Sequence, residues 1–111
     1  MTMSIRRGAA AFAVVALLGL PLVAQADNKH VNEAVEHAKG AVNHGKQGHA
    51  DAVAQHAEEA LKHAQAAGVK NPHLDEGIKE LKEAVTHGKA GHADVATQHA
   101  EAAVMHLSEV K

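Results

Sequence analysis

The chain has 111 residues, with 13 acidic and 11 basic side chains and a formal net charge of −2 when histidine is neutral. It has no cysteine, which excludes a disulfide framework, a thiolate metal site, an iron–sulfur cluster and a CxxCH haem attachment. Because the net charge is negative, we expect no nucleic-acid partner.

Residues 1–26 have the features of a secretory signal peptide. Arg6 and Arg7 precede an apolar run, and Ala24-Gln25-Ala26 fits a small-residue cleavage site. A transmembrane anchor is the alternative, but the run is short for a membrane span and contains a proline. We expect cleavage after Ala26, export to the periplasm, and no membrane partner for the mature chain. Both arginines leave with the leader, which changes the net charge from −2 to −4.

The remaining residues, 27–111, are short enough for one small all-α domain. Apolar residues recur at helical spacing in four segments, which predicts helices at about 29–44, 49–67, 72–87 and 92–109. Glycine-containing segments at 45–48 and 88–91 predict tight helix-to-helix turns, and Gly68 followed by Asn71-Pro72 predicts a helix end and a new start. These short connections favour an up-down-up-down four-helix bundle, with an open pair of helical hairpins as the alternative.

The mature chain is a duplication. Shifting it by 43 residues aligns repeat 30–63 with repeat 73–106, and 18 of the 34 aligned residues are identical. Each repeat predicts one helical hairpin. Among the histidines of the first repeat only His37 has a different partner, which is Glu80.

The hydrophobic core is expected to be thin. The only aromatic residue, Phe12, lies in the leader, so the core must consist of Ala, Val, Leu and Ile. We expect Met105 to pack near the end of the last helix. So small a core supplies little stability by itself, which makes a stabilising metal ion or partner plausible.

The chain contains eleven histidines, mostly seven residues apart within each predicted helix. Imidazole is the commonest metal ligand among side chains, whereas ordinary solvated helix faces use Lys and Glu in no fixed register. We therefore treat every histidine as a candidate metal ligand, with ordinary surface polarity as the alternative. The candidates are His30, His37, His44, His49, His56, His63, His73, His87, His92, His99 and His106.

A seven-residue step advances about 10.5 Å along a helix, so two such histidines cannot hold one ion without help from another helix. In an antiparallel hairpin, residues equidistant from the turn lie at the same height, and we call such a pair a rung. The predicted rungs are His30–His63, His37–His56, His44–His49, His73–His106, Glu80–His99 and His87–His92. If the histidines instead face away from the hairpin partner, His63 would pair with His73 and His49 with His87.

Several carboxylates lie one helical turn from a histidine and can complete a site. They are Glu33, Glu59, Glu76, Glu83 and Glu109, with ordinary solvated helix charge as the alternative.

Imidazole with carboxylate suits Cu(II), Ni(II) and Zn(II), and the usual affinity order favours Cu(II). The segments Glu36-His37-Ala38-Lys39 and His44-Gly45-Lys46-Gln47-Gly48-His49 resemble the repeats of the small metal-binding protein family, which comprises exported, histidine-rich helical proteins. The resemblance covers nearly the whole mature chain. It implies binding of several divalent ions, copper above all, in the periplasm, with a part in copper tolerance or management. Glu80 departs from the pattern and puts the site around His99 in question.

Two other functions compete with metal binding. An enzyme is disfavoured, because the chain has no Glu-x-x-His segment, no recognisable Ser/His/Asp arrangement and no phosphate-binding loop. A pH-responsive interaction protein or chaperone is the stronger rival, since protonated histidine clusters would loosen a bundle. We expect a monomer that binds divalent metal ions and has no catalytic residues.

Overall fold

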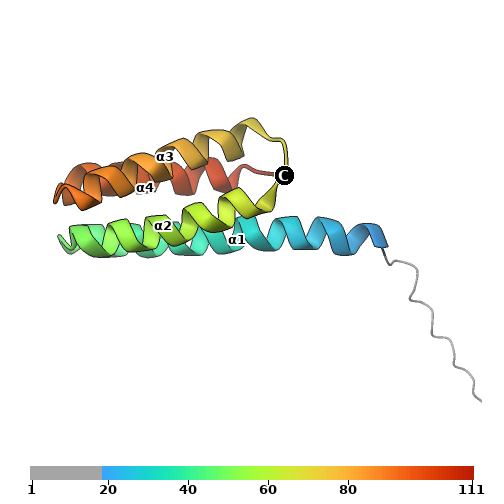
Figure 1. Ribbon diagram of the computed structural model, residues 1–111, viewed down its shortest axis with the longest axis horizontal. Helices are drawn as coiled ribbons and strands as arrows, with labels where there is room; N and C mark the ends of the chain where they lie inside the picture. The colour runs from blue at the N-terminus through green and yellow to red at the C-terminus, as the bar shows by residue number, and fades with distance from the viewer. Residues whose placement is uncertain (1–18) are drawn as a thin grey trace, which may run out of the picture.

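The computed structural model describes residues 19–111, which form four helices: α1 (Gly19–Lys46), α2 (Ala50–Ala67), α3 (Pro72–Lys89) and α4 (Ala93–Ser108) (Figure 1). None of these residues forms a strand, so the all-α prediction is confirmed. The bounds of α2, α3 and α4 agree with the predicted ones to within two residues.

The beginning of α1 differs from the prediction. The helix begins at Gly19 rather than near residue 29, and it continues without a break through the expected cleavage site after Ala26. Residues 1–18 of the predicted signal peptide lie outside the described residues, so the leader stays a prediction. No helix in the described part of the chain combines the length and the apolar character needed to cross a membrane.

The turn between α1 and α2 is a Schellman motif. Gly48 has a φ of 83°, the left-handed conformation that glycine adopts most readily. The His49 N–H donates to the His44 carbonyl at 3.0 Å, and the Gly48 N–H donates to the Gly45 carbonyl at 2.9 Å. These bonds satisfy the last carbonyls of α1 and bring the chain directly to the start of α2.

The turn between α3 and α4 has the same construction. Gly91 has a φ of 84°, and the His92 N–H donates to the His87 carbonyl at 2.9 Å. In both turns, therefore, a histidine in the last turn of one helix is hydrogen-bonded through the backbone to the histidine that precedes the next helix.

Gly45 and Gly88, which we predicted as turn residues, lie inside α1 and α3 and are buried. Their role is close packing between helices. A Cβ atom on Gly45 would lie 1.8 Å from Oγ1 of Thr97 in α4, and one on Gly88 would lie 2.9 Å from the Ala50 carbonyl oxygen in α2. Glycine at these two positions thus allows the α1–α2 pair to approach the α3–α4 pair.

The boundary between the two helix pairs agrees with the sequence analysis. Gly68 follows α2 with a φ of 68°, and Asn71 precedes α3, with Pro72 at the first helical position. The Asn71 side chain accepts a hydrogen bond of 2.8 Å from the His73 N–H. This cap satisfies one of the free N–H groups at the start of α3.

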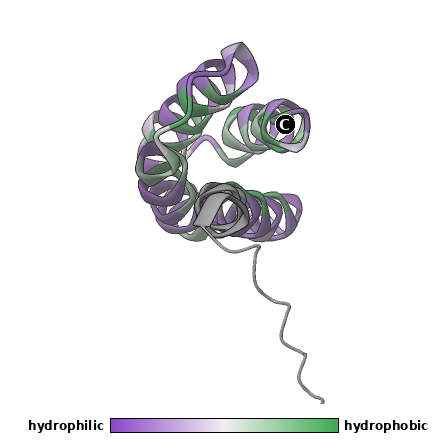
Figure 2. Ribbon diagram, turned by 90° about the vertical axis from the view of Figure 1, so that its right-hand side faces the viewer, coloured by the Kyte–Doolittle hydropathy of each residue, from purple (hydrophilic) through white to green (hydrophobic). Residues whose placement is uncertain are grey.

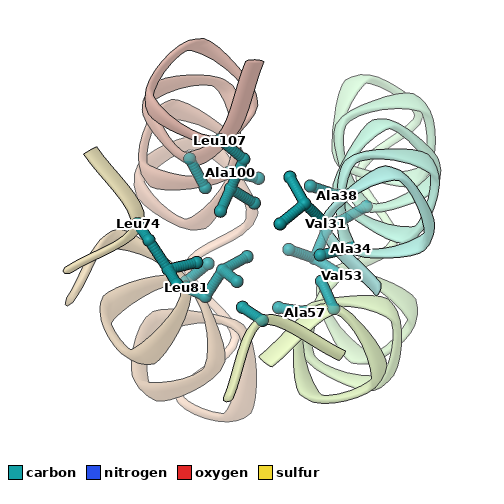
Figure 3. Packing of buried hydrophobic residues seen from close by; sticks show 14 of the residues in the cluster. Val31, Ala34, Ala38, Val53, Ala57, Leu74, Leu81, Ala100 and Leu107 are labelled. Atoms are coloured by element: carbon teal, nitrogen blue, oxygen red, sulfur yellow. The ribbon is translucent and has the colours of Figure 1, made fainter. Parts of the chain in front are cut away.

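The core lies between all four helices, and their hydrophobic sides turn inward in the end-on view (Figure 2). It consists largely of alanine, with Leu81, Leu107 and Val53 as the largest fully buried side chains (Figure 3). Helix α1 packs against α2 and α4, and α3 packs against the same two helices. Met105, expected to pack, is 69% exposed. The core therefore consists mostly of small side chains, as the composition predicted.

Candidate metal centre

The histidines lie at the border between the core and the solvent. Eight of the eleven are half-buried, whereas His49, His73 and His92 are exposed. This is the placement expected for side chains about a quarter to a third of a turn away from the apolar stripe. An imidazole at this border is partly shielded from water and still accessible to an ion.

Histidines of consecutive helices face each other in rungs. In the first helix pair (α1, α2 and their turn), the ring centroids are 5.8 Å apart for His30–His63, 6.2 Å for His37–His56 and 6.1 Å for His44–His49. In the second helix pair (α3, α4 and their turn), they are 6.0 Å apart for both His73–His106 and His87–His92. The alternative pairing across α2 and α3 is not observed among the described residues.

The rungs are linked by diagonal contacts that the sequence analysis missed. The ring centroids of His37–His63, His44–His56 and His87–His99 are 5.2, 4.8 and 5.3 Å apart, closer than within any rung. Side chains on a helix lean toward its N-terminus, so those on two antiparallel helices lean toward each other along one diagonal. In the first helix pair, the six histidines consequently form one continuous series, which we call the histidine ladder: His30, His63, His37, His56, His44 and His49.

Carboxylates complete three groups whose ligand atoms all lie within 4.8 Å of one another. Two are in the first helix pair, His30–Glu33–His63 and His37–Glu59–His63, and they share His63. The third, Glu83–His87–His99, is in the second. Of the predicted carboxylates, Glu76 and Glu109 belong to none of these groups.

Glu33 and Glu80 make the closest carboxylate contacts with imidazoles. Oε1 of Glu33 lies 3.1 Å from Nδ1 of His63 and 3.9 Å from Nδ1 of His30. Oε1 of Glu80 lies 2.7 Å from Nδ1 of His99. The second repeat has Glu80 where the first has His37, so this rung is a short hydrogen bond between Glu80 and His99 rather than a pair of imidazoles.

Two imidazole nitrogens of the ladder have no hydrogen-bond partner in the described part of the chain. Nδ1 of His30 and Nδ1 of His44 are buried and have no hydrogen-bond partner among the described residues. A buried polar atom without a partner costs about 1–3 kcal/mol. A metal ion bound to either nitrogen would remove that cost.

One imidazole of the ladder, that of His56, has a lowered pKa. Burial lowers the pKa of His56 below 6.5, and the neighbouring His44 and His37 lower it further, against an opposing effect of Glu59. Neutral imidazole is the form that binds metal, so His56 is held in its ligating form near neutral pH.

The spacing of the rings suits a bridging ion. With metal–nitrogen bonds of about 2.0–2.1 Å, two imidazoles on one ion have their centroids roughly 4.5–6.5 Å apart, depending on the angle at the metal. All of the rungs and diagonals fall within this range. Open depressions beside His44 and His49, and beside His37, His56 and Glu59, give access from the solvent.

Paired imidazoles with nearby carboxylates on a small helical protein are typical of the class of metal-binding proteins. The comparison with protein families agrees: the small metal-binding protein family model matches residues 3–110, and the chain belongs to this family. The match confirms the resemblance noted in the sequence. No curated protein matches the chain.

Proposed function

We propose that the protein binds several divalent transition-metal ions, with Cu(II) preferred, and buffers or carries them in the periplasm. The observation that supports this proposal is the histidine ladder, in which each imidazole lies within bridging distance of a neighbour on the other helix. Binding as such, without catalysis, agrees with membership of the small metal-binding protein family.

The preference for copper follows from ligand chemistry. Imidazole and carboxylate ligands bind Cu(II) more tightly than Ni(II) or Zn(II), so those two ions are the expected competitors. Soft ligands that select Cu(I) are absent from residues 27–111 apart from Met105, whose exposed thioether belongs to none of the three His/Glu groups.

The proposal includes the architecture. We take the protein to be a monomeric up-down-up-down bundle derived from a duplicated hairpin. The repeat at 43 residues, the two similar Schellman turns and the packing of each helix against two neighbours support this view. The leader at residues 1–26 supports export, since its two arginines and apolar run are typical of a secretory signal.

The test is a calorimetric titration of residues 27–111 with Cu(II) at neutral pH, with circular dichroism on the same samples and Ni(II) and Zn(II) as comparators. We expect several Cu(II) equivalents and a gain of thermal stability. Binding no tighter than millimolar would refute the proposed function.

A double variant locates one site. His44→Ala with His49→Ala should remove about one Cu(II), because it deletes the rung at the first turn. The matched control, Asn43→Ala with Gln47→Ala, changes exposed neighbours and should remove none. Loss of all binding in the double variant would contradict separate sites along the ladder.

The second candidate is a pH-responsive interaction protein, which the lowered pKa of His56 favours. Protonation of closely spaced imidazoles introduces like charges, so acid should loosen the bundle and release metal together. Helicity and metal occupancy that are both unchanged between pH 7.5 and about pH 5 would exclude this candidate, since the range spans the ordinary histidine pKa of about 6.5.

A further inference from the structure

The two helix pairs present different ligands at the same place in the repeat. The centre of the first pair consists of His37, Gly40, His44 and His56, and the aligned centre of the second pair consists of Glu80, Glu83, His87 and His99. The two changes, His37 to Glu80 and Gly40 to Glu83, both add a carboxylate. They also fall around the same two imidazoles, so they alter one site rather than two.

The first centre is built from imidazoles. His56 lies between His37 and His44, with ring centroids 6.2 and 4.8 Å away. On the side of α1, His56 packs over Gly40, where a Cβ atom would lie 3.0 Å from its Nδ1 atom. One carboxylate lies beside this centre, because Glu59 groups with His37 and His63.

The second centre combines two imidazoles with two carboxylates. The rings of His87 and His99 stack with centroids 5.3 Å apart, and Oε1 of Glu83 lies 3.6 Å from Nε2 of His87. Glu83, His87 and His99 can each place one ligand atom within 4.8 Å of the others.

Glu80 orients the imidazole of His99. It accepts the hydrogen bond from His99 Nδ1, which leaves Nε2 of the same ring free to bind an ion. Its side chain is 26% exposed, less than that of any other carboxylate in an ion pair of the described residues, so water screens its charge least.

We infer that the second centre is a metal site of a different class, which takes a divalent ion that favours oxygen ligands, such as Mn(II) or Fe(II). Its two carboxylates balance the charge of a divalent ion, whereas the first centre has one carboxylate beside it, that of Glu59. Two histidines with one carboxylate are the ligands of many non-haem Fe(II) sites, and carboxylate with water suits Mn(II). This inference rests on the proposed function, because it assigns a second ligand class to one of the bound ions.

The experiment is a Mn(II) titration of residues 27–111, in which electron paramagnetic resonance measures free Mn(II), paired with a Cu(II) titration of the same samples. We expect the wild-type protein to bind one Mn(II) ion more tightly than any further Mn(II) ion. Glu80→Gln with Glu83→Gln should weaken that site by about tenfold or more, the size typical for loss of a ligand or its orienting partner. Glu76→Gln with Glu109→Gln changes the charge of the second helix pair equally outside the metal-binding groups, and should leave Mn(II) affinity within about twofold.

A repeat exchange tests the ligand class directly. Glu80→His with Glu83→Gly gives the second centre the residues of the first, so it should lose the Mn(II) site while Cu(II) binding persists. Circular dichroism of each variant is the control for folding. Equal Mn(II) affinity in wild type and exchange variant, or equal weakening in the control, would overturn the inference. Cu(II) binding without Mn(II) binding in the wild type would overturn it and leave the proposed function standing, whereas binding of neither ion would refute both.

Discussion

Replacing Leu81 by alanine tests whether metal ions stabilise a thin core. Leu81 is fully buried in α3 and is one of the three largest such side chains, in a core made mostly of alanine. Buried Leu→Ala substitutions cost about 2–5 kcal/mol, because the burial of the deleted apolar atoms is lost and a cavity remains. Domains of this size are stable by about 5–15 kcal/mol, and a lean core belongs to the lower part of that range.

The expected change in Tm follows from these values. A loss of about 1 kcal/mol lowers the Tm of a domain of 60–100 residues by about 4–8 °C, so a loss of about 3 kcal/mol lowers it by about 12–24 °C. Thermal unfolding of metal-free residues 27–111, followed by circular dichroism, measures this shift. Met105→Ala, at a side chain 69% exposed, is the control and should change stability by less than about 0.5 kcal/mol.

Adding Cu(II) should recover most of the loss. An ion that binds only the folded chain, at a free concentration of 100 Kd, contributes about 2.7 kcal/mol for each site. The Leu81→Ala variant with Cu(II) should therefore melt near the temperature of the metal-free wild type. A shift below about 4 °C in the metal-free variant would refute the reasoning about the core, and no recovery with bound Cu(II) would refute stabilisation by the metal.

Three further predictions use the same unfolding measurement on metal-free protein. Burial and neighbouring imidazoles lower the pKa of His56, so the unfolded chain takes up a proton at this residue before the folded chain does as pH falls. Stability should therefore be highest above about pH 6.5 and decrease below it. The variant His56→Gln should weaken this pH dependence, and a Tm that is equal at pH 7.5 and pH 5 would contradict it. Gly45→Ala should cost about 1–3 kcal/mol, since its Cβ would overlap Thr97, and adding Thr97→Ala should recover part of that; an unchanged Tm would contradict the close packing. Asn71→Ala should cost about 1 kcal/mol by removing the cap of α3, whereas Asn71→Ser should keep most of the stability.

The helices and their turns could be predicted because local chemistry determines them. Gly48 and Gly91 occupy left-handed positions, and the Asn71-Pro72 pair begins α3, as the residue types indicate. The sequence predicts Gly45 as a turn residue, which is wrong, because a helical glycine needed for close packing has the same sequence signal as a turn glycine. Only the position of Thr97 on another helix distinguishes the two roles.

The rungs of the site could be predicted from symmetry about each turn, but the diagonals could not. Residue numbers give height along a hairpin, whereas the diagonal contact of His44 with His56 depends on the lean of side chains on antiparallel helices. For the same reason the sequence alone indicates only the loss of an imidazole ligand at Glu80. Its hydrogen bond to His99 becomes evident only when the side chains are placed.

The histidine ladder and the hydrophobic core contribute differently to the stability of the two helix pairs. The first pair buries mostly alanine, with Val31 and Val53 as its largest buried side chains, and carries the complete histidine ladder. The second buries Leu74, Leu81 and Leu107, and Glu80 interrupts its series of imidazoles. An ion that joins α1 to α2 therefore adds stability where burial of apolar surface supplies least, because each buried methylene contributes only about 0.8 kcal/mol and alanine has few to bury. Metal binding should accordingly slow hydrogen exchange more in α1 and α2 than in α3 and α4.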